Sequence, residues 1–240
     1  MLILYKYMPC NEFTFKALAV RGLWCHNPRE MNDPSECLDI LERTLPVPEI
    51  VKLHELIKST PNSPLAMLAN LPNNQVNKIL SESRKRMANS FAFCSLSTKC
   101  DDVLMWSHYA NCHKGMVIGI EPDTDEAQDS LQKVEYLNHL PDWNVEEYFR
   151  FMNGEDEFRH IFLRDLSVKS KHWHQESEYR IWRKQPGYWL YKEEQIKEVY
   201  FGVDCDLITK KVVLELLNFL PENFPIYEME INKETLDLTW

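Results

Sequence analysis

The 240-residue chain is predicted to be an α+β protein, with a mixed, largely antiparallel and split sheet of about six to eight strands flanked by helices. Two observations predict this class. Short apolar or alternating runs typical of strands are interleaved with runs of helical period. Their spacing lacks the regular strand–helix–strand repeat of a doubly wound sheet. We expect one domain over residues 1–240, with a helical insertion or lid near 38–90.

The first half of the chain is predicted to contain two strands before this helical insertion, the second of them followed by a loop within residues 23–36, and one strand after it. Residues 2–8 (LILYKYM) are typical of a first strand, and residues 12–22 of a short helix that ends at Gly22. Residues 38–90 have helical periodicity, and several prolines divide them into separate helices. Residues 91–97 (FAFCSLS) are apolar enough for a buried strand.

The second half is predicted to alternate between strands and helices. We expect a helix over 101–115, capped by Asp101 or Asp102 and ended by Gly115. The remaining elements are predicted strands at 116–121, 132–137, 172–180, 197–203 and 224–232, and predicted helices at 145–166, with a break near Gly154, and at 205–220.

Composition excludes several classes of protein. The net charge of −10 disfavours broad attraction to nucleic acid or to anionic membranes. The chain has only 6 glycines and neither a GxGxxG nor a GxxxxGK[ST] motif, so the common glycine-rich nucleotide loops are absent from the sequence. No run approaches 18 apolar residues, and the 7 cysteines are scattered without a CxxC pair. We therefore predict a soluble cytoplasmic protein with reduced thiols and no membrane partner.

The segment KHWHQESEYRIW, residues 171–182, concentrates ionisable side chains. If it is a strand, its period of two places one set of polar side chains on a single face: His172, His174, Glu176, Glu178 and Arg180. The two carboxylates would lie about 7 Å apart. Arg180 could pair with one of them and leave the other free for acid–base chemistry or for stabilising an oxocarbenium-like centre.

The same segment allows two other interpretations. His172, His174 and Glu176 could hold a metal ion for hydrolysis, with a further ligand from Glu178, His108 or His113. Alternatively, the charges could form the solvated face of a strand in a non-catalytic binding module.

Two further groups of residues could bind a planar ligand. Trp106, His108 and Tyr109 follow Ser95 and Ser97 in the sequence, and together they could line a pocket with a stacking ring. The first strand places Tyr5 and Tyr7 on one face and Lys6 on the other, as a polar handle for a nucleotide ribose or phosphate.

Six motifs, in this order along the chain, resemble the uncharacterised family DUF2971: LYKY, NDPSE, FCSLS, LMWSHYANCHKGMVIGIE, KHWHQESEYRI and IKEVYFG. More distantly, LYKY, the FCSLS strand with its following helix, and QESE resemble the three separated motifs of the ADP-ribosyltransferase fold. This resemblance implies that NAD is the substrate and that no metal takes part. The acceptor would be a protein, a nucleic acid or water.

The resemblance to ADP-ribosyltransferases also implies roles for individual residues. Glu178 would be the catalytic carboxylate at the nicotinamide ribose, with Glu176 orienting the acceptor and Arg180 beside them. The residues that would bind NAD are Tyr5, Lys6, Tyr7, Ser95, Ser97, Trp106, His108 and Tyr109. Proteins with this chemistry often act as bacterial toxins or anti-phage defence effectors, and we expect such a role here by analogy.

Overall fold

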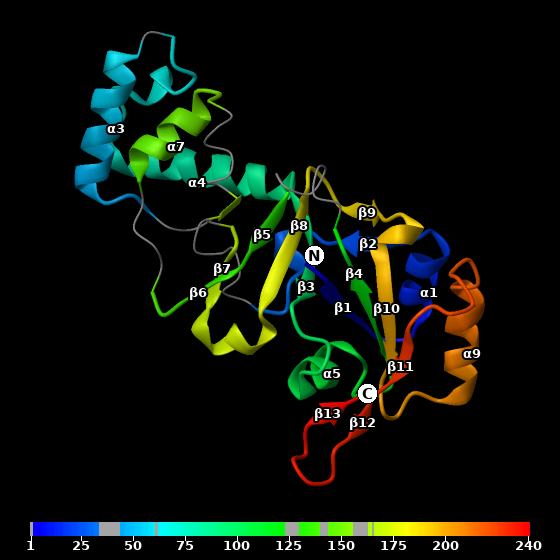
Figure 1. The fold of residues 1–240 in the computed structure, drawn as a ribbon. Helices are drawn as coiled ribbons and strands as arrows, with labels where there is room; N and C mark the ends of the chain where they lie inside the picture. Colours follow the sequence, from blue (N-terminus) through cyan, green and yellow to red (C-terminus); the bar gives the residue numbers. More distant parts are fainter. Residues whose placement is uncertain are drawn as a thin grey trace.

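The computed structural model describes residues 2–33, 44–60, 62–122, 130–139, 144–155, 163–164 and 166–240. Within these ranges, a seven-stranded sheet is covered by helices on both faces, and a separate group of helices extends from one side (Figure 1). No helix in the described ranges is long and apolar enough to cross a membrane.

Most strands lie on the predicted runs, β8 begins later than predicted, and several short strands are additional. They are β1 (Leu4–Met8), β2 (Gly22–Cys25), β3 (Ala92–Ser97), β4 (Met116–Ile120), β5 (Leu131–Lys133), β6 (Glu135–Leu137), β7 (Val168–Ser170), β8 (Glu178–Arg183), β9 (Gly187–Leu190), β10 (Ile196–Phe201), β11 (Ile226–Glu228), β12 (Glu230–Ile231) and β13 (Leu238–Thr239). The helices are α1 (Glu12–Ala19), α3 (Val47–Ser59), α4 (Asn73–Asn89), α5 (Val103–Tyr109), α7 (Val145–Met152) and α9 (Leu207–Leu216), and the 3₁₀ turns are η1 (Pro28–Glu30), η2 (Ala66–Leu68), η4 (Lys171–Glu176) and η5 (Glu193–Gln195).

The main sheet has the strand order β11-β10-β4-β1-β3-β8-β5. Only β10 and β11 pair in parallel, and the other neighbours are antiparallel. The predicted class, an α+β protein with a mixed and largely antiparallel sheet, is confirmed.

The sheet is narrowly joined at its centre, between β1 and β3. These two strands share one residue pair, Tyr5 with Ser97, whereas β1 and β4 share the full length of β1. The Lys6 ammonium donates to the carbonyl oxygen of Ser95 at 3.0 Å. Buried backbone carbonyls require a hydrogen-bond donor. The Lys6 side chain supplies one to Ser95 where the two strands are not paired.

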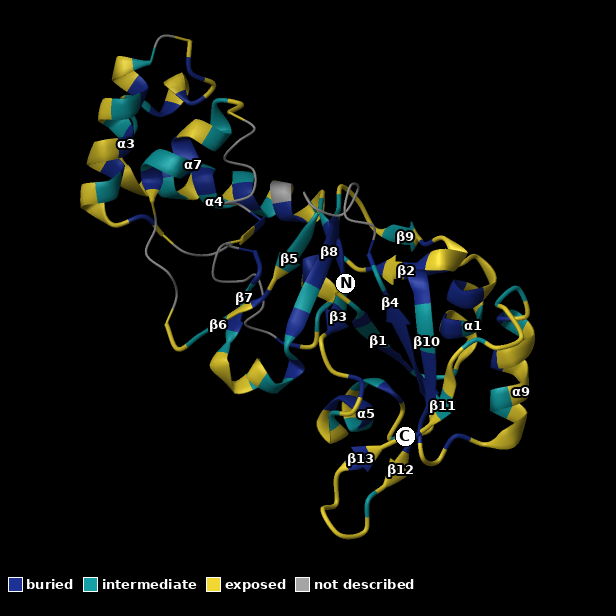
Figure 2. Ribbon diagram, viewed as in Figure 1, coloured by how far each residue is buried: buried dark blue, intermediate teal, exposed yellow. Residues whose placement is uncertain are grey.

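The two faces of the sheet have separate apolar cores, and its central strands are buried (Figure 2). On one face, alternate residues of the strands pack against α1, α9 and the β2–β9 ribbon, including Leu4, Ile118 and Ile181. On the other face, Tyr7, Val117 and Tyr200 pack against Trp106 of α5. This alternation is the period of two expected for strands buried on both sides.

The predicted helical insertion forms a third core of its own. Helices α3 and α4 pack together with α7, around buried residues such as Ile50, Leu53 and Phe149. Asn27 connects this group to the sheet, because its amide group donates to the carbonyls of Ala88 and Asn89 at the end of α4. The predicted helical segment at 38–43 lies outside the described residues.

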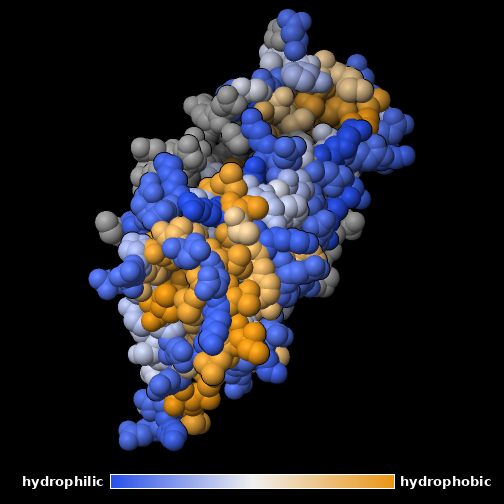
Figure 3. Space-filling view, turned by 90° about the vertical axis from the view of Figure 1, so that its right-hand side faces the viewer, coloured by the Kyte–Doolittle hydropathy of each residue, from blue (hydrophilic) through white to orange (hydrophobic). Residues whose placement is uncertain are grey.

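Apolar side chains also gather on the outside of the molecule, on the side that carries α1 and α9 (Figure 3). The exposed apolar residues of α9 are Leu207, Ile208, Val212 and Leu214. More than half of the accessible surface of a folded protein is ordinarily apolar, so we assign no function to this side.

Helix α5 is shorter than predicted. Asp102 caps its first turn as expected, by accepting from the amides of Leu104 and Met105. The helix ends at Tyr109, so the predicted end at Gly115 is wrong. Three consecutive residues, Asn111 to His113, have positive φ values of 50°, 51° and 66°, and this left-handed run stops the helix.

Gly115 allows two backbone segments to lie close together. A Cβ at this position would lie 2.2 Å from the carbonyl oxygen of Met8, which no real contact allows. The amide of Gly115 donates to the carbonyl of Ala110 at 2.8 Å. The turn after α5 is thereby held against β1.

We expect Gly115→Ala to lower the free energy of unfolding by about 3 kcal/mol, because the added methyl group must push two backbone segments apart. Lys114→Ala is the matched control, since Lys114 is exposed beside it. The control should change stability by less than about 0.5 kcal/mol. Urea unfolding followed by circular dichroism measures both variants, and equal stabilities would contradict this account of the turn.

Candidate functional site

A pocket of about 220 Å³ lies where β1, β3 and β8 meet α5, η4 and the segment 26–33. Aromatic and ionisable side chains dominate its lining, which consists of Tyr5, Lys6, Tyr7, His26, Glu30, Met31, Asn32, Asp33, Phe93, Ser95, Leu96, Ser97, Met105, Tyr109, Lys169, Trp173, Glu176 and Glu178. These residues come from distant parts of the sequence, so the pocket is a product of the tertiary fold.

Glu178 is the first residue of β8, and it is held on several sides. It pairs in register with Ser97 of β3, and its side chain is only 4% exposed. Its Oε1 accepts from Arg180 Nε at 2.9 Å, and its Oε2 lies 3.3 Å from the Lys169 ammonium. Burial raises the pKa of Glu178, while Lys169 and the Ser95 hydroxyl act to lower it.

Glu176 reaches the same place from the end of η4. Its Oε1 accepts from the Tyr109 hydroxyl at 2.6 Å, and its Oε2 accepts from the Lys169 ammonium at 2.6 Å. Its backbone carbonyl accepts from the Ser97 hydroxyl at 2.7 Å, which anchors η4 to β3. Ser177, between the two glutamates, has left-handed backbone angles of φ 45° and ψ 48°.

The predicted strand over 172–180 is therefore wrong in its first half. Residues 171–176 form the 3₁₀ turn η4, and the strand begins only at Glu178. Glu176 and Glu178 still converge, but they do so because the left-handed Ser177 redirects the chain and because both carboxylates contact Lys169.

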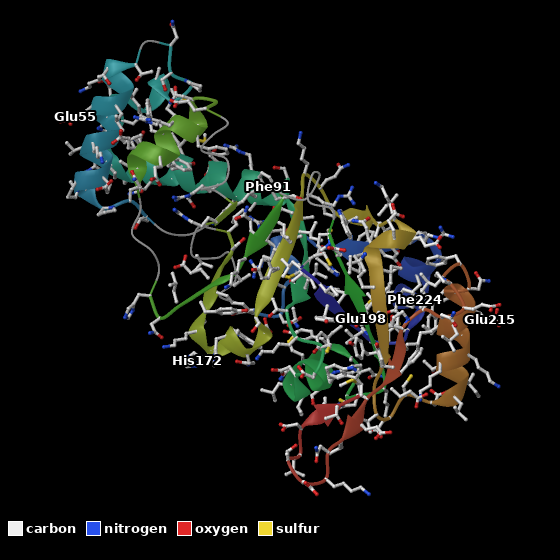
Figure 4. The ribbon with its side chains drawn as sticks, viewed as in Figure 1. Glu55, Phe91, His172, Glu198, Glu215 and Phe224 are labelled. Atoms are coloured by element: carbon white, nitrogen blue, oxygen red, sulfur yellow. The ribbon has the colours of Figure 1, made fainter. Side chains whose placement is uncertain are left out.

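The 3₁₀ turn η4 also places the two histidines outside the pocket. His172 and His174 are exposed, and His172 lies on the outer side of η4, whereas Glu176 is buried (Figure 4). A 3₁₀ turn has three residues per turn, so side chains two apart point in different directions. In the described part of the chain, no group of three or more His, Cys, Asp or Glu side chains is arranged to hold a metal ion. The metal site predicted from His172, His174 and Glu176 is not formed.

Arg180 lies beneath the pocket and does not line it. Its side chain is fully buried, and it packs over the Phe93 ring with 4.3 Å between the guanidinium carbon and the ring centroid. It donates to Glu178 and, at 2.7 Å, to the carbonyl of Leu166. Burial lowers the pKa of Arg180 and Asp33 opposes this effect, but a guanidinium stays protonated at neutral pH.

The predicted residues of the first strand all line the pocket. The Tyr5 hydroxyl donates to Glu198 Oε1 at 2.6 Å, and the Tyr7 hydroxyl donates to the carbonyl of Lys99 at 2.9 Å. Burial raises the pKa of both tyrosines, so both remain neutral donors. Lys6 was expected on the opposite face, and it reaches the pocket lining at the narrow junction of β1 and β3.

The predicted residues of α5 are divided between pocket, core and solvent. Tyr109 lines the pocket beside Glu176. Trp106 is fully buried, and its indole donates to the carbonyl of Cys100 at 2.8 Å. His108 is exposed, with its ring 6.1 Å from that of Tyr109. The structure thus brings Tyr5, Lys6, Tyr7, Ser95, Ser97, Tyr109, Glu176 and Glu178 together, and it leaves Trp106 and His108 outside the lining.

Lys169, Trp173 and Tyr136 belong to the site, and the sequence analysis missed all three. Lys169 comes from the three-residue strand β7, and the Tyr136 hydroxyl accepts from the amide of Glu178 at 2.8 Å. Trp173 lines the pocket from η4 and lies over the Lys169 ammonium at 5.1 Å. Only Trp173 had a signal, because it stands inside the conspicuous KHWHQESEYRIW segment.

Glu178 and Arg180 are expected to be energetically coupled. Arg180→Met should lower the free energy of unfolding by about 3–5 kcal/mol, because it removes a fully buried partner of a buried carboxylate. With Glu178→Gln also present, the loss should be smaller than the sum of the single losses by about 1–3 kcal/mol. Urea unfolding of the four proteins in this cycle measures the coupling.

The matched control is the pair of Arg150 and Glu146 on α7, which are 3.2 Å apart but exposed. Its coupling should be about 0.3–0.5 kcal/mol. Equal couplings in the two cycles would show that burial adds nothing to the pair formed by Glu178 and Arg180.

Comparison with known proteins gives one match. No curated protein and no solved structure matches the chain. The model of a family described as "Protein of unknown function (DUF2971)" matches residues 105–181, a span that overlaps most of α5 and β8 and includes both glutamates. The predicted resemblance to DUF2971 is confirmed over this stretch of the chain.

Proposed function

We propose that the protein is an NAD-using enzyme of the ADP-ribosyltransferase type, either a transferase or an NAD glycohydrolase. One observation carries the proposal: Glu178, Ser95, Tyr109 and the tyrosines of β1 line a single pocket although they are far apart in sequence. A binding surface built from unrelated features would leave these residues on different faces. Their convergence supports a common ligand.

The pocket has the size and the lining for one part of a dinucleotide. Its volume of about 220 Å³ is below the roughly 300–1,000 Å³ typical of sites for drug-sized ligands. It therefore suits a ring with its attached sugar, such as the nicotinamide riboside end of NAD. Tyr109 and Trp173 offer aromatic surfaces to the ring, and Ser95 and Tyr7 are polar groups near the sugar.

The carboxylate of Glu178 suits the chemistry of this bond. Cleavage of the glycosidic bond sends its electron pair to the pyridinium nitrogen, and positive charge develops on the ribose. A carboxylate held by Arg180 and Lys169 at the edge of the pocket stabilises that charge where it forms. Water or another acceptor then bonds to the ribose carbon and releases one proton.

Glu176 is the second carboxylate of the site, and we assign it to the acceptor side. Both of its oxygens already have partners, Tyr109 and Lys169. It therefore acts on the acceptor through the Tyr109 hydroxyl. By analogy, we extend the proposal to a role as a toxin or an anti-phage effector that consumes NAD or modifies a cellular target.

We expect purified protein to release nicotinamide from NAD, and Glu178→Gln to slow this release by about 10²–10³-fold, because it removes the charge that stabilises the transition state. Glu194→Gln, at an exposed position, is the matched control and should leave the rate unchanged. Liquid chromatography of nicotinamide measures the rates, and circular dichroism verifies folding.

Two outcomes decide against the enzyme. No release with water, protein or nucleic-acid acceptors, together with no NAD binding by calorimetry, would reject the proposal entirely. NAD binding without release would identify a binding module in place of a catalyst.

The role of Tyr109 is tested by separating its ring from its hydroxyl. Tyr109→Ala should raise the KM for NAD about tenfold, because stacking between rings contributes about 0.5–1.5 kcal/mol. Tyr109→Phe keeps the ring and loses the hydrogen bond to Glu176, so it should lower kcat more than it raises KM. Steady-state kinetics distinguish the two variants, and an equal rise of KM in both would argue against stacking by the ring.

A further inference from the structure

We propose that Lys169 is a positioning residue, which holds Glu176 and Glu178 at the pocket and keeps the Glu178 carboxylate charged at neutral pH. Only the kinetic test of this inference rests on the proposed function. It concerns a residue that no motif in the sequence indicates, on a strand of three residues outside the main sheet.

The contacts of Lys169 indicate that it serves the carboxylates and not a ligand. Its ammonium lies 2.6 Å from Glu176 Oε2, 3.3 Å from Glu178 Oε2 and 5.1 Å from the centre of the Trp173 ring. An ammonium has three N–H donors. These three neighbours surround the Lys169 ammonium, and the Lys169 side chain is only 7% exposed. A substrate phosphate would have to displace one of these neighbours to reach it.

The placement of Lys169 depends on short elements that surround the glutamates. Strand β7 pairs in parallel with β6, which joins Lys169 to Tyr136 in register. The Tyr136 hydroxyl accepts from the amide of Glu178, and η4 follows β7 directly in the chain. The lysine and both carboxylates therefore form one closed unit, in which a shift of any member moves the others.

Charge explains why this unit needs a cation. The side chains of Glu176 and Glu178 are 6% and 4% exposed, and both reach the same ammonium. Without that ammonium, burial and the neighbouring Glu176 would both act against the charged form of Glu178, which would bind a proton more readily. Arg180 compensates Glu178 from below, and its polar partners among the described residues include Glu178 and the carbonyl of Leu166.

The other charged and titratable groups around Lys169 do not replace it. Tyr109 of α5 and Tyr136 of β6 face the unit, and the pKa of each is raised, chiefly by burial, so both are neutral. Asp33 acts on Arg180 and adds a further negative charge nearby. Burial by itself would lower the pKa of Lys169, but Glu178 and Glu176 raise it above its ordinary value. The lysine therefore stays charged.

The test replaces the charge of Lys169 and follows the ionisation of Glu178. In Lys169→Met, loss of the cation raises the pKa of the Glu178 carboxyl. The acid limb of kcat/KM for nicotinamide release should therefore move to higher pH by about 1–3 units. Lys169→Arg keeps the charge, so its limb should stay near that of the wild type even if its rate falls. Lys171→Met, at an exposed position two residues away, is the matched control and should not move the limb.

A second measurement does not depend on turnover. Carbon-13 NMR of labelled glutamate carboxyls follows the titration of Glu178, whose signal is assigned by its loss in Glu178→Gln. The titration midpoint should rise in Lys169→Met and stay in place in Lys169→Arg. Lys169→Gln, which retains hydrogen-bond donors, serves if the methionine variant does not fold.

The outcomes separate this inference from the proposed function. Unchanged carboxyl midpoints in the variants that lack the charge would overturn the role of Lys169, whatever the kinetics. A raised midpoint in a protein that never releases nicotinamide would support the role of Lys169 and reject the enzyme.

Discussion

The site depends on a buried group of charges in which each ion offsets the free-energy cost of burying the others. Glu176, Glu178, Lys169 and Arg180 are almost entirely removed from water, and each has an opposite charge within 3.3 Å. Removing one partner from such a group leaves an uncompensated charge, which costs more than the pair itself contributes. Because its members come from η4, β7 and β8, the group also fixes how these elements meet.

The narrow junction in the centre of the sheet accounts for the position of the pocket. Strands β1 and β3 pair only at Tyr5 and Ser97, and beyond this point their backbones are not joined in a ladder. Side chains from both strands occupy the space, and Lys6 provides one carbonyl with a partner. A fully paired sheet would have filled this region with backbone contacts. The interrupted pairing thus allows residues of the first strand to share a pocket with Glu178.

Glu176 and Glu178 converge as expected, but the local structure that brings them together is not the predicted strand. Alternation along a strand predicts that Glu176 and Glu178 lie on one side, and it predicts the same for His172 and His174. The 3₁₀ turn and the left-handed Ser177 separate the histidines from the glutamates. The sequence gives little sign of a left-handed serine. Its backbone conformation is imposed by the packing of its neighbours, because serine itself does not favour it.

The sequence by itself determined the fold class, the bounds of the longer strands, the cap of α5 and the resemblance to DUF2971, because periodicity, capping residues and motifs are local properties of the chain. It also indicated eight of the 18 residues that line the pocket, since most of these eight stand in conspicuous clusters of tyrosine, serine and glutamate. Only the tertiary structure decided that Lys169 belongs to the site, that Arg180 lies beneath it, and that Trp106 and His108 lie outside its lining. The physical reason is that burial and ion pairing depend on contacts between segments distant in the chain, and no local pattern records those contacts.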